Sequence, residues 1–175
     1  MERKVESRIR TSTGVRATLP ADVRILDSTF LSNQYGVYGS GGAIVNVSRS
    51  AFSGSQYAVY ASGDVNATYT KVTISDTIAA GNIYGFTAES LTGTTGNVSM
   101  AVTRSTASNG NYGIYVHRVG GNNVWAALSG NLVTHNSVSG IYNGGGSAVY
   151  TQGNNTVKFN TLDLDGVALT AMPGV

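Results

Sequence analysis

The chain has 175 residues, enough for one domain, and it is rich in glycine and poor in charge. Apolar residues make up 41% and charged residues only 11%, with 23 glycines and two prolines, which argues against disorder and against a helical fold. The formal net charge of +2 is too small to indicate a nucleic-acid partner, so we expect none.

The chain contains no cysteine, which excludes disulfides, thiolate metal sites and a cysteine nucleophile. No run of about 18 apolar residues is present, so we expect no membrane span. The opening segment, MERKVESRIR, lacks the apolar stretch of a signal peptide. If the protein is exported, its leader is absent from this sequence.

Residues 1–21 differ from the rest because they hold many arginines and lack the repeat that follows. Val5 and Ile9 are four residues apart, which favours a short helix. The alternative is an imperfect strand through residues 12–19, ended by Pro20. The ends of a solenoid need cover because unpaired strand edges promote association. We therefore interpret this segment as an N-terminal cap, or as an added segment foreign to the natural domain.

One pattern recurs throughout residues 22–175. Its first copy is VRILDSTFLSNQYGVY, and later copies keep the same offsets from the position of Ile25. The Tyr-Gly-type positions that mark successive copies are 22, 27, 28, 27 and 26 residues apart; they are Tyr35, Tyr57, Tyr84, Tyr112, Ser139 and Asp165. Such self-similarity identifies a repeat protein.

Three apolar columns recur at fixed offsets and predict the core. They are Ile25, Val47, Ile74, Val102 and Leu128; Phe30, Phe52, Ala79, Ala107, Val133 and Val157; and Val37, Val59, Phe86, Ile114, Ile141 and Val167. Three short strands per copy, separated by bends, predict an all-β fold: a single-stranded parallel β-helix, or β-solenoid, of about six coils. The longest loops, at 87–97 and 116–123, should follow the third strand of their copies.

Two polar columns lie between the apolar ones and predict hydrogen-bonded ladders at the corners. They are Ser28, Ser50, Thr77, Ser105, Asn131 and Asn155; and Asn33, Ser55, Asn82, Asn136 and Asn160. We expect glycine and asparagine to supply the left-handed backbone angles at the bends.

The ending Gly153-Asn154-Asn155-Thr156-Val157, followed by Asn160 and Asp165-Gly166, is similar to the last coil of exported bacterial β-helix proteins. Over residues 22–170 the chain resembles right-handed parallel β-helix repeat proteins of the pectate-lyase-like superfamily. That superfamily includes polysaccharide lyases, hydrolases and epimerases as well as non-catalytic shafts and adhesins, so the fold by itself assigns no function. The resemblance implies an exported or cell-surface location.

Two residues after the Ile25-type position, charges of opposite sign alternate down neighbouring coils: Asp27, Arg49, Asp76 and Arg104. This strip could hold a sugar chain, and its members are weak catalytic candidates. Lyases that resemble this fold use several carboxylates around Ca²⁺ with an arginine base, and hydrolases use adjacent aspartates. Here no two acids adjoin on neighbouring coils, so neither arrangement is evident, and a surface ladder of ion pairs is the favoured interpretation.

The two histidines, His117 in a loop and His135 beside a corner asparagine, occupy different repeat positions. Neither has a partner at metal-ligand spacing, so we predict no metal site and no cofactor.

Eight of the ten tyrosines fall in two columns: Tyr35, Tyr57, Tyr84 and Tyr112; and Tyr38, Tyr60, Tyr115 and Tyr142. Strand alternation places the residues equivalent to Val37 inward, so the second column should point outward, with an interruption at Thr87. An outward aromatic ladder could stack sugar rings or present a protein-binding stripe, and the second column is our candidate ligand-binding set. The alternative is that the rings only stabilise the coils by cross-strand stacking.

The sequence therefore favours a non-catalytic β-solenoid that serves as an exported structural module or as a carbohydrate- or protein-binding module. The alternative is a polysaccharide-active enzyme, a lyase or hydrolase, that uses the charged strip or the long loops. Polysaccharide or a surface protein is the expected partner. End-to-end association into a homo-oligomer is a further expectation, because a solenoid has open strand edges at its ends.

Overall fold

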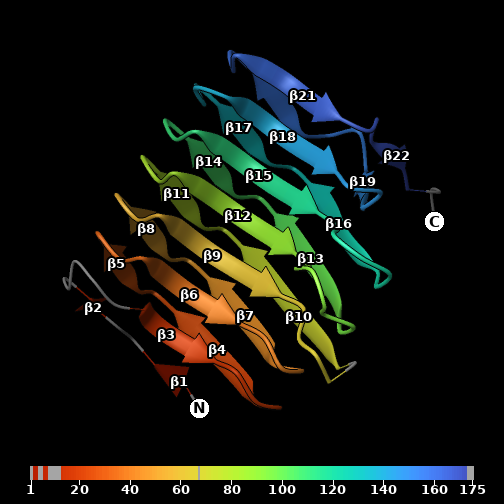
Figure 1. The fold of residues 1–175 in the computed structure, drawn as a ribbon. Helices are drawn as coiled ribbons and strands as arrows, with labels where there is room; N and C mark the ends of the chain where they lie inside the picture. Colours follow the sequence, from red (N-terminus) through yellow and green to blue (C-terminus); the bar gives the residue numbers. More distant parts are fainter. Residues whose placement is uncertain (1, 4–5, 8–12, 67, 173–175) are drawn as a thin grey trace.

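The computed structural model describes residues 2–3, 6–7, 13–66 and 68–172, and none of these residues is helical. The chain winds through three parallel sheets, one strand per sheet in each coil, and the coils stack into a prism (Figure 1). Strands β4 to β21 make up six successive coils. The predicted all-β parallel solenoid is therefore confirmed.

The three sheets are named A, B and C in the order in which the chain visits them. Sheet A consists of β1 (Glu2–Arg3), β4 (Asp22–Leu26), β7 (Ile44–Ser48), β10 (Tyr69–Ser75), β13 (Asn97–Thr103), β16 (Val124–Ser129), β19 (Ala148–Thr151) and β22 (Thr170–Ala171). Sheet B consists of β2 (Glu6–Ser7), β5 (Thr29–Leu31), β8 (Ala51–Ser53), β11 (Ile78–Ala80), β14 (Thr106–Ser108), β17 (Leu132–Thr134) and β20 (Thr156–Lys158). Sheet C consists of β3 (Thr13–Ala17), β6 (Tyr35–Gly39), β9 (Tyr57–Ser62), β12 (Tyr84–Glu89), β15 (Tyr112–His117), β18 (Ser139–Gly144) and β21 (Leu162–Gly166).

The strands form because β-branched residues alternate with polar ones, and the apolar set then faces the interior. In β7, Val45 and Val47 are buried while Asn46 between them is half-buried on the outer face. The pairing register places equivalent residues side by side, with Ile25 opposite Val47 and Val47 opposite Ile74. One continuous core results.

The predicted core columns are confirmed except at the last coil. Phe30 and Phe52 stack with their ring centroids 4.7 Å apart and their planes 3° from parallel. Every other member up to Val133 and Ile141 is buried, and Val157 is partly buried. Each large side chain that is removed from water in this way contributes about 1.5–3 kcal/mol to folding.

In the last coil the predicted alignment is wrong. We expected Asp165, Gly166 and Val167 to continue the Tyr-Gly-Val positions, but Leu164 pairs with Ile141 and Asp165 pairs with Tyr142. Leu164 therefore takes the column of Ile141, where it is 41% exposed in the last coil, and Val167 is 54% exposed. The resemblance of Asp165-Gly166 to a Tyr-Gly pair misled the alignment, because the turn from sheet B to sheet C is shorter here than expected.

The corner ladders are confirmed, and each rung is a hydrogen bond from a backbone N–H to a side-chain oxygen of the following coil. At the corner between sheets A and B the acceptors are Ser50 Oγ (3.2 Å), Thr77 Oγ1 (3.4 Å), Ser105 Oγ (3.1 Å), Asn131 Oδ1 (3.0 Å) and Asn155 Oδ1 (2.9 Å). At the corner between sheets B and C they are Ser55 Oγ (3.2 Å), Asn82 Oδ1 (2.9 Å), Asn136 Oδ1 (3.2 Å) and Asn160 Oδ1 (3.0 Å). Backbone groups that no strand satisfies are paired in this way.

The left-handed backbone angles are supplied differently at the two corners. At the corner between sheets B and C, Gly54, Gly81 and Asn109 have positive φ, as expected, but Ser32, His135 and Phe159 take this conformation in the other three coils. At the corner between sheets A and B, the four charged residues of the strip take this conformation instead, with φ values between 46° and 50°. The expectation of glycine and asparagine is therefore wrong at the four strip positions and at three positions of the other corner.

The N-terminal segment contributes strands. Among its described residues, Thr13–Ala17 form β3, which pairs with β6 in sheet C, and β1 and β2 pair with β4 and β5. The strand alternative for residues 12–19 therefore describes this region. Val5 and Ile9, on which the helix alternative rested, lie outside the described residues.

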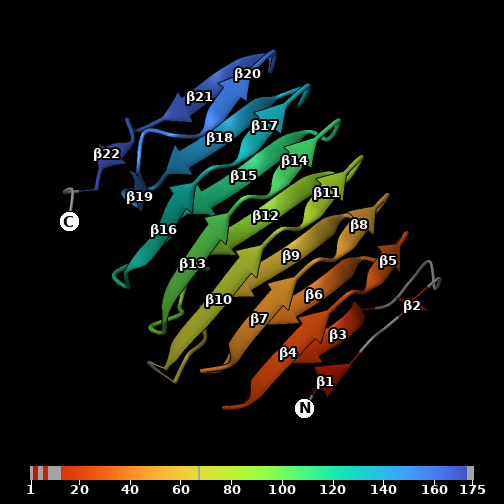
Figure 2. The same ribbon diagram turned by 180° about the vertical axis from the view of Figure 1, so that it is seen from behind.

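The long loops all lie at the corner between sheets C and A. Loop residues 90–96 join β12 to β13, and 118–123 join β15 to β16. The tight turns between sheets B and C lie on the opposite side of the prism, as the two views show (Figures 1 and 2). Structural variation between coils is thus concentrated along one edge of the molecule.

Candidate functional site

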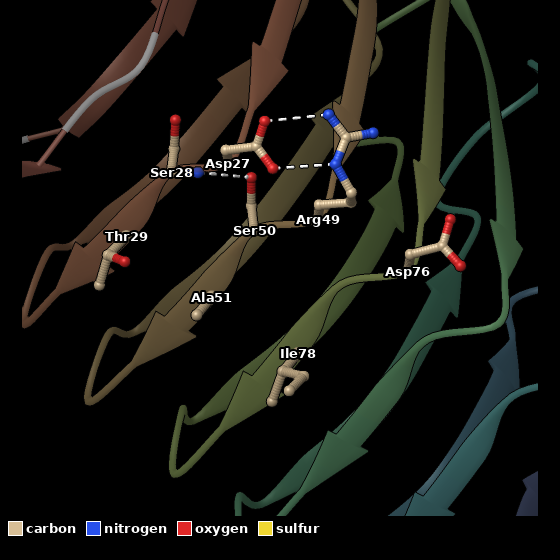
Figure 3. Close-up of a pocket in the computed structure, with 8 residues that line it drawn as sticks. All are labelled: Asp27, Ser28, Thr29, Arg49, Ser50, Ala51, Asp76 and Ile78. Atoms are coloured by element: carbon tan, nitrogen blue, oxygen red, sulfur yellow. Dashed lines mark hydrogen bonds and ion pairs between the residues drawn. The ribbon is translucent and has the colours of Figure 1, made fainter.

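The charged strip consists of two separate ion pairs. Arg49 donates to both carboxylate oxygens of Asp27, at 2.8 and 2.9 Å, and Arg104 donates to both oxygens of Asp76, each at 2.8 Å. In Figure 3, Asp76 lies one coil beyond Arg49 and points away from it. The predicted alternation of charge is present, but it is resolved into bidentate pairs rather than a continuous strip.

The Arg104 pair favours the charged form of Asp76. Hydrogen bonds from Arg104 lower the pKa of the Asp76 carboxyl below its ordinary value. A glycosidase acid needs a carboxyl whose pKa is raised, so Asp76 has the wrong electrostatic environment for that role. All four side chains are at least 41% exposed. The geometry is that of a surface ion-pair ladder.

A wide, open depression of about 430 Å³ lies beside the strip and is lined by Asp27, Arg49, Asp76 and their neighbours in sheet B (Figure 3). The strip lies at the corner between sheets A and B, whereas the loops at 90–96 and 118–123 lie at the corner between sheets C and A. The long loops therefore do not wall this depression.

The outer face of sheet C carries all eight tyrosines of the two predicted columns, and we call it the tyrosine face. In the first column adjacent rings stack: Tyr35 on Tyr57 (5.1 Å), Tyr57 on Tyr84 (4.7 Å) and Tyr84 on Tyr112 (5.0 Å), with interplanar angles of 8°, 11° and 3°. In the second column Tyr38 stacks on Tyr60 (5.5 Å) and Tyr115 on Tyr142 (4.6 Å). Edge-to-face contacts such as Tyr112 to Tyr115 (5.2 Å) join the columns.

This stacking determines which part of each ring a partner can reach. The centroids in a column are about one strand spacing apart and the planes nearly parallel, so each inner ring covers its neighbour's face. At one end of the second column, the Arg16 guanidinium lies 5.1 Å from the centroid of Tyr38 and covers that face as well. The tyrosine face therefore presents mainly ring edges and hydroxyl groups.

The second column is interrupted at Thr87, as predicted, and the interruption creates a polar cluster that sequence reasoning missed. Thr87 is fully buried, and the Tyr60 hydroxyl donates to Glu89 Oε2 at 2.9 Å. Glu89 Oε1 lies 3.4 Å from Nδ1 of His117. His117 is the last residue of β15 rather than a loop residue, and its ring contacts Tyr115 and Tyr142.

Tyr60 differs from the other candidate binding residues because it is only 5% exposed. The structure brings Tyr38, Tyr115 and Tyr142 to the surface as half-buried side chains, but it packs Tyr60 beneath its neighbours. The sequence predicts by strand alternation that these four tyrosines lie on the outer face. The burial of Tyr60 could not be predicted, because it depends on the space over Thr87 and on the carboxylate of Glu89 two residues further along β12.

Burial and Glu89 together make the phenols of the tyrosine face harder to ionise. Burial, followed by the charges of Tyr84 and Glu89, raises the pKa of Tyr57 to about 12. Burial and then Glu89 also raise the pKa values of Tyr60 and Tyr115. These hydroxyls remain protonated donors at any physiological pH, and none is poised to act as a base.

His135, the other histidine, stacks on Phe159 at the turn between sheets B and C, with centroids 5.7 Å apart. Within the described residues no cluster of three or more histidine, aspartate or glutamate side chains could hold a metal ion. The same part of the chain contains no helix long and apolar enough to cross a membrane.

Comparison of the chain with protein-family models, with curated proteins and with solved structures finds no match.

Proposed function

We propose that this chain is a non-catalytic β-solenoid whose tyrosine face binds a partner macromolecule, with a protein a better fit than a polysaccharide. The observation that carries the proposal is the tyrosine face itself: eight tyrosines on one sheet, locked together by stacking and edge-to-face contacts. Aromatic residues are enriched in protein interfaces, where tyrosine supplies both apolar area and a hydroxyl.

The rigidity of the tyrosine face favours binding. A side chain that is already held by its neighbours loses little rotamer freedom when a partner arrives, so less of the interaction energy is spent on ordering it. Tyr84, for example, contacts Tyr57, Tyr112 and Tyr115 at once. Glu89, with a side chain 16% exposed, adds one fixed carboxylate among the tyrosines.

The arrangement of the rings favours a protein over a sugar chain. A sugar stacks on an aromatic ring through the ring's open face, and the inner rings of the tyrosine face cover one another. Ring edges and hydroxyls, in contrast, suit the mixed apolar and hydrogen-bonding contacts of a protein interface. The position of the acids supports a non-catalytic role, because the exposed carboxylates of the strip are each engaged by an arginine.

Membership of the pectate-lyase-like superfamily and export from the cell are part of the same proposal. Their support is the repeat of three strands per coil and the serine and asparagine ladders at the corners. A shaft or adhesin of that kind would use the prism as a spacer and sheet C as its contact surface.

The test is a pair of unbiased binding screens, a displayed peptide library and a glycan array, each run with the wild type and with a variant that carries Tyr38→Ser, Tyr115→Ser and Tyr142→Ser. These positions are half-buried at the surface, whereas Tyr60 is left intact because it is buried. We expect peptides that bind the wild type and lose binding to the variant. A second variant with phenylalanine at the same positions separates the contribution of the hydroxyls from that of the rings.

Selected peptides that bind the serine variant as tightly as the wild type would contradict the proposal. Glycans that require the three tyrosines would contradict the protein part and reinstate the sugar platform. The matched control is Tyr69→Ser, which removes an exposed tyrosine from sheet A and should change neither screen.

A further inference from the structure

A second aromatic site lies on sheet A, near the corner with sheet C and away from the tyrosine face. It is a pocket of about 210 Å³, lined by Arg118, Asn123, Val124, Trp125, Gly146, Ala148 and Tyr150. Pockets for drug-sized ligands measure roughly 300–1,000 Å³, so this one has room for a single ring-sized group.

The two aromatic rings of this pocket have no aromatic cross-strand partner. Trp125 pairs across the sheet with Ser99 on one side and Ala148 on the other, and Tyr150 pairs with Ala127 and Thr170. Because these neighbours are small, no ring among the described residues stacks on the indole. Trp125 and Tyr150 meet edge to face, with centroids 6.5 Å apart. A ligand ring can therefore lie against the indole, which is not possible at the inner rings of sheet C.

The third functional group of the pocket is a guanidinium that two glycines hold in place. The backbone N–H of Arg118 donates to the carbonyl of Gly144 at 3.2 Å, and Gly145 packs so closely on the Arg118 backbone that a Cβ could not fit. Gly146 lies beneath the guanidinium, where a Cβ would come within 3.3 Å of Nη2. Both glycines have positive φ, so this turn is shaped around the arginine.

The charge of Arg118 is not neutralised by the protein. Within the described part of the chain no carboxylate lies at ion-pair distance from it. Its Nε is shielded from solvent and finds no acceptor among the described groups. Arg49 and Arg104, in contrast, each hold an aspartate in a bidentate pair. A fixed guanidinium with unused donors, beside an open indole face, is suited to an anion that is attached to a ring.

We propose that this pocket binds one sugar ring that carries an anionic substituent, with the ring against Trp125 and the anion on Arg118. The carboxylate of a uronic acid and a sulfate ester share the chemistry that the guanidinium recognises. Tyr150 supplies a second aromatic wall for the ring. This site is separate from the tyrosine face, and it does not depend on the function proposed for that face.

Trp125 is the only tryptophan of the chain, so its fluorescence and its indole N–H resonance report on this pocket alone. The probes are glucose, glucuronate and glucose 6-sulfate, which share one ring and differ in the group at C6. We expect glucuronate or the sulfate ester to shift both signals in a saturable way, and glucose to bind at least about tenfold more weakly, because it lacks the charge-assisted hydrogen bond. Binding of glucuronate alone assigns a carboxylate site, and binding of both anions assigns a general anion site.

The decisive variant is Arg118→Gln, which should lower the affinity for the anionic sugar about tenfold or more while the melting temperature stays close to that of the wild type. Arg104→Gln is the matched control, because it removes the same type of charge from a distant corner and should leave binding unchanged. Trp125→Ala, followed by calorimetry, should abolish binding. The proposal is overturned if none of the three sugars shifts the indole signal, if glucose binds as tightly as glucuronate, or if Arg118→Gln retains full affinity.

Discussion

Sheet C and sheet A both carry aromatic side chains on their outer faces, but the rings stack from coil to coil in sheet C, whereas Trp125 and Tyr150 of sheet A meet edge to face. In sheet C the tyrosines recur in register, so each ring stacks on the equivalent ring of the next coil, as Tyr57 does on Tyr84. In sheet A, Trp125 has serine and alanine as its cross-strand neighbours. The same side-chain chemistry therefore has different consequences: aromatic residues that repeat down a column stabilise one another, and an aromatic residue that occurs once remains available to a ligand.

Sheets C and A also differ in how their charged side chains are paired. In sheet C the carboxylate of Glu89 is shared by Tyr60 and His117. At the edge of sheet A the guanidinium of Arg118 has no such partner among the described residues. A binding site in a repeat protein is thus best sought where one coil departs from its neighbours, and repetition by itself marks structure.

The largest expected effect on stability comes from a core substitution, which would remove the tyrosine face and the Trp125 pocket together. Val47→Asp places a carboxylate in a core position that is 1% exposed, and an unpaired buried charge costs several kcal/mol, so we expect the stack of coils to unfold. Thermal and urea unfolding followed by circular dichroism measure the loss. Thr73→Asp, at an exposed position of the same sheet, is the control and should unfold like the wild type. Normal melting of Val47→Asp would show that the core register is incorrect.

The comparison of sheets C and A predicts that Tyr84 contributes more to stability than Trp125, although tyrosine is the smaller residue. Tyr84→Ala removes two stacked pairs, each worth about 0.5–1.5 kcal/mol beyond the buried area. Trp125→Ala removes a larger ring but no stacked pair, so we expect it to lower the free energy of unfolding by less. Chemical denaturation of the two variants decides the matter. An equal or greater loss for Trp125→Ala would show that the indole is a packing residue.

The phenols of sheet C should make the protein sensitive to alkali. Tyr57 has an ordinary pKa of 10.0 that burial, Tyr84 and Glu89 raise to about 12 in the folded state. Between these values the unfolded chain loses the proton and the folded chain keeps it, so stability is lost as the pH rises through this window. Urea denaturation at increasing pH should show the decline. Glu89→Gln should shift the phenolate absorbance titration of the tyrosine face to lower pH, and an unchanged titration would exclude Glu89 as a cause.

The smallest effect is expected at the ion pairs. Arg49→Gln and Arg104→Gln break exposed pairs, which are screened by salt and held by long, flexible side chains, so the melting temperature should change little. Comparison of thermal unfolding in low and high salt measures this contribution. A large loss of stability that salt removes would show that the left-handed corner residues depend on their partners.

Much of the fold could be predicted because each coil repeats the same physical constraints. Ile25, Phe30 and their equivalents had to be inward for any consistent stacking, and the serine and asparagine columns had to satisfy corner N–H groups. The last coil was misaligned because Asp165-Gly166 resembles Tyr-Gly, although Leu164 is the residue that pairs with Ile141. Local similarity there was stronger than the requirement that the apolar residue face inward.

The candidate sites were less predictable from the sequence than the fold was. The tyrosine columns and the alternating charges follow from register, although the burial of Tyr60 and the division of the charges into two pairs do not. The roles of Glu89, Arg118 and Trp125 do not, because each occurs once and acquires its neighbours from loops or from other coils. The run Gly144-Gly145-Gly146 was the available signal, because Gly145 packs on the backbone of Arg118 and Gly146 on its guanidinium.

The corner ladders have a consequence for how such a chain can change in length. Each rung requires one oxygen, and serine, threonine and asparagine all supply it at the same position, as Ser50, Thr77 and Asn131 do. Neighbouring coils thus recognise each other through interchangeable acceptors rather than through unique pairs. A whole coil could be duplicated or deleted between two rungs without any new junction being required, so the coil is a unit of inheritance as well as a unit of structure.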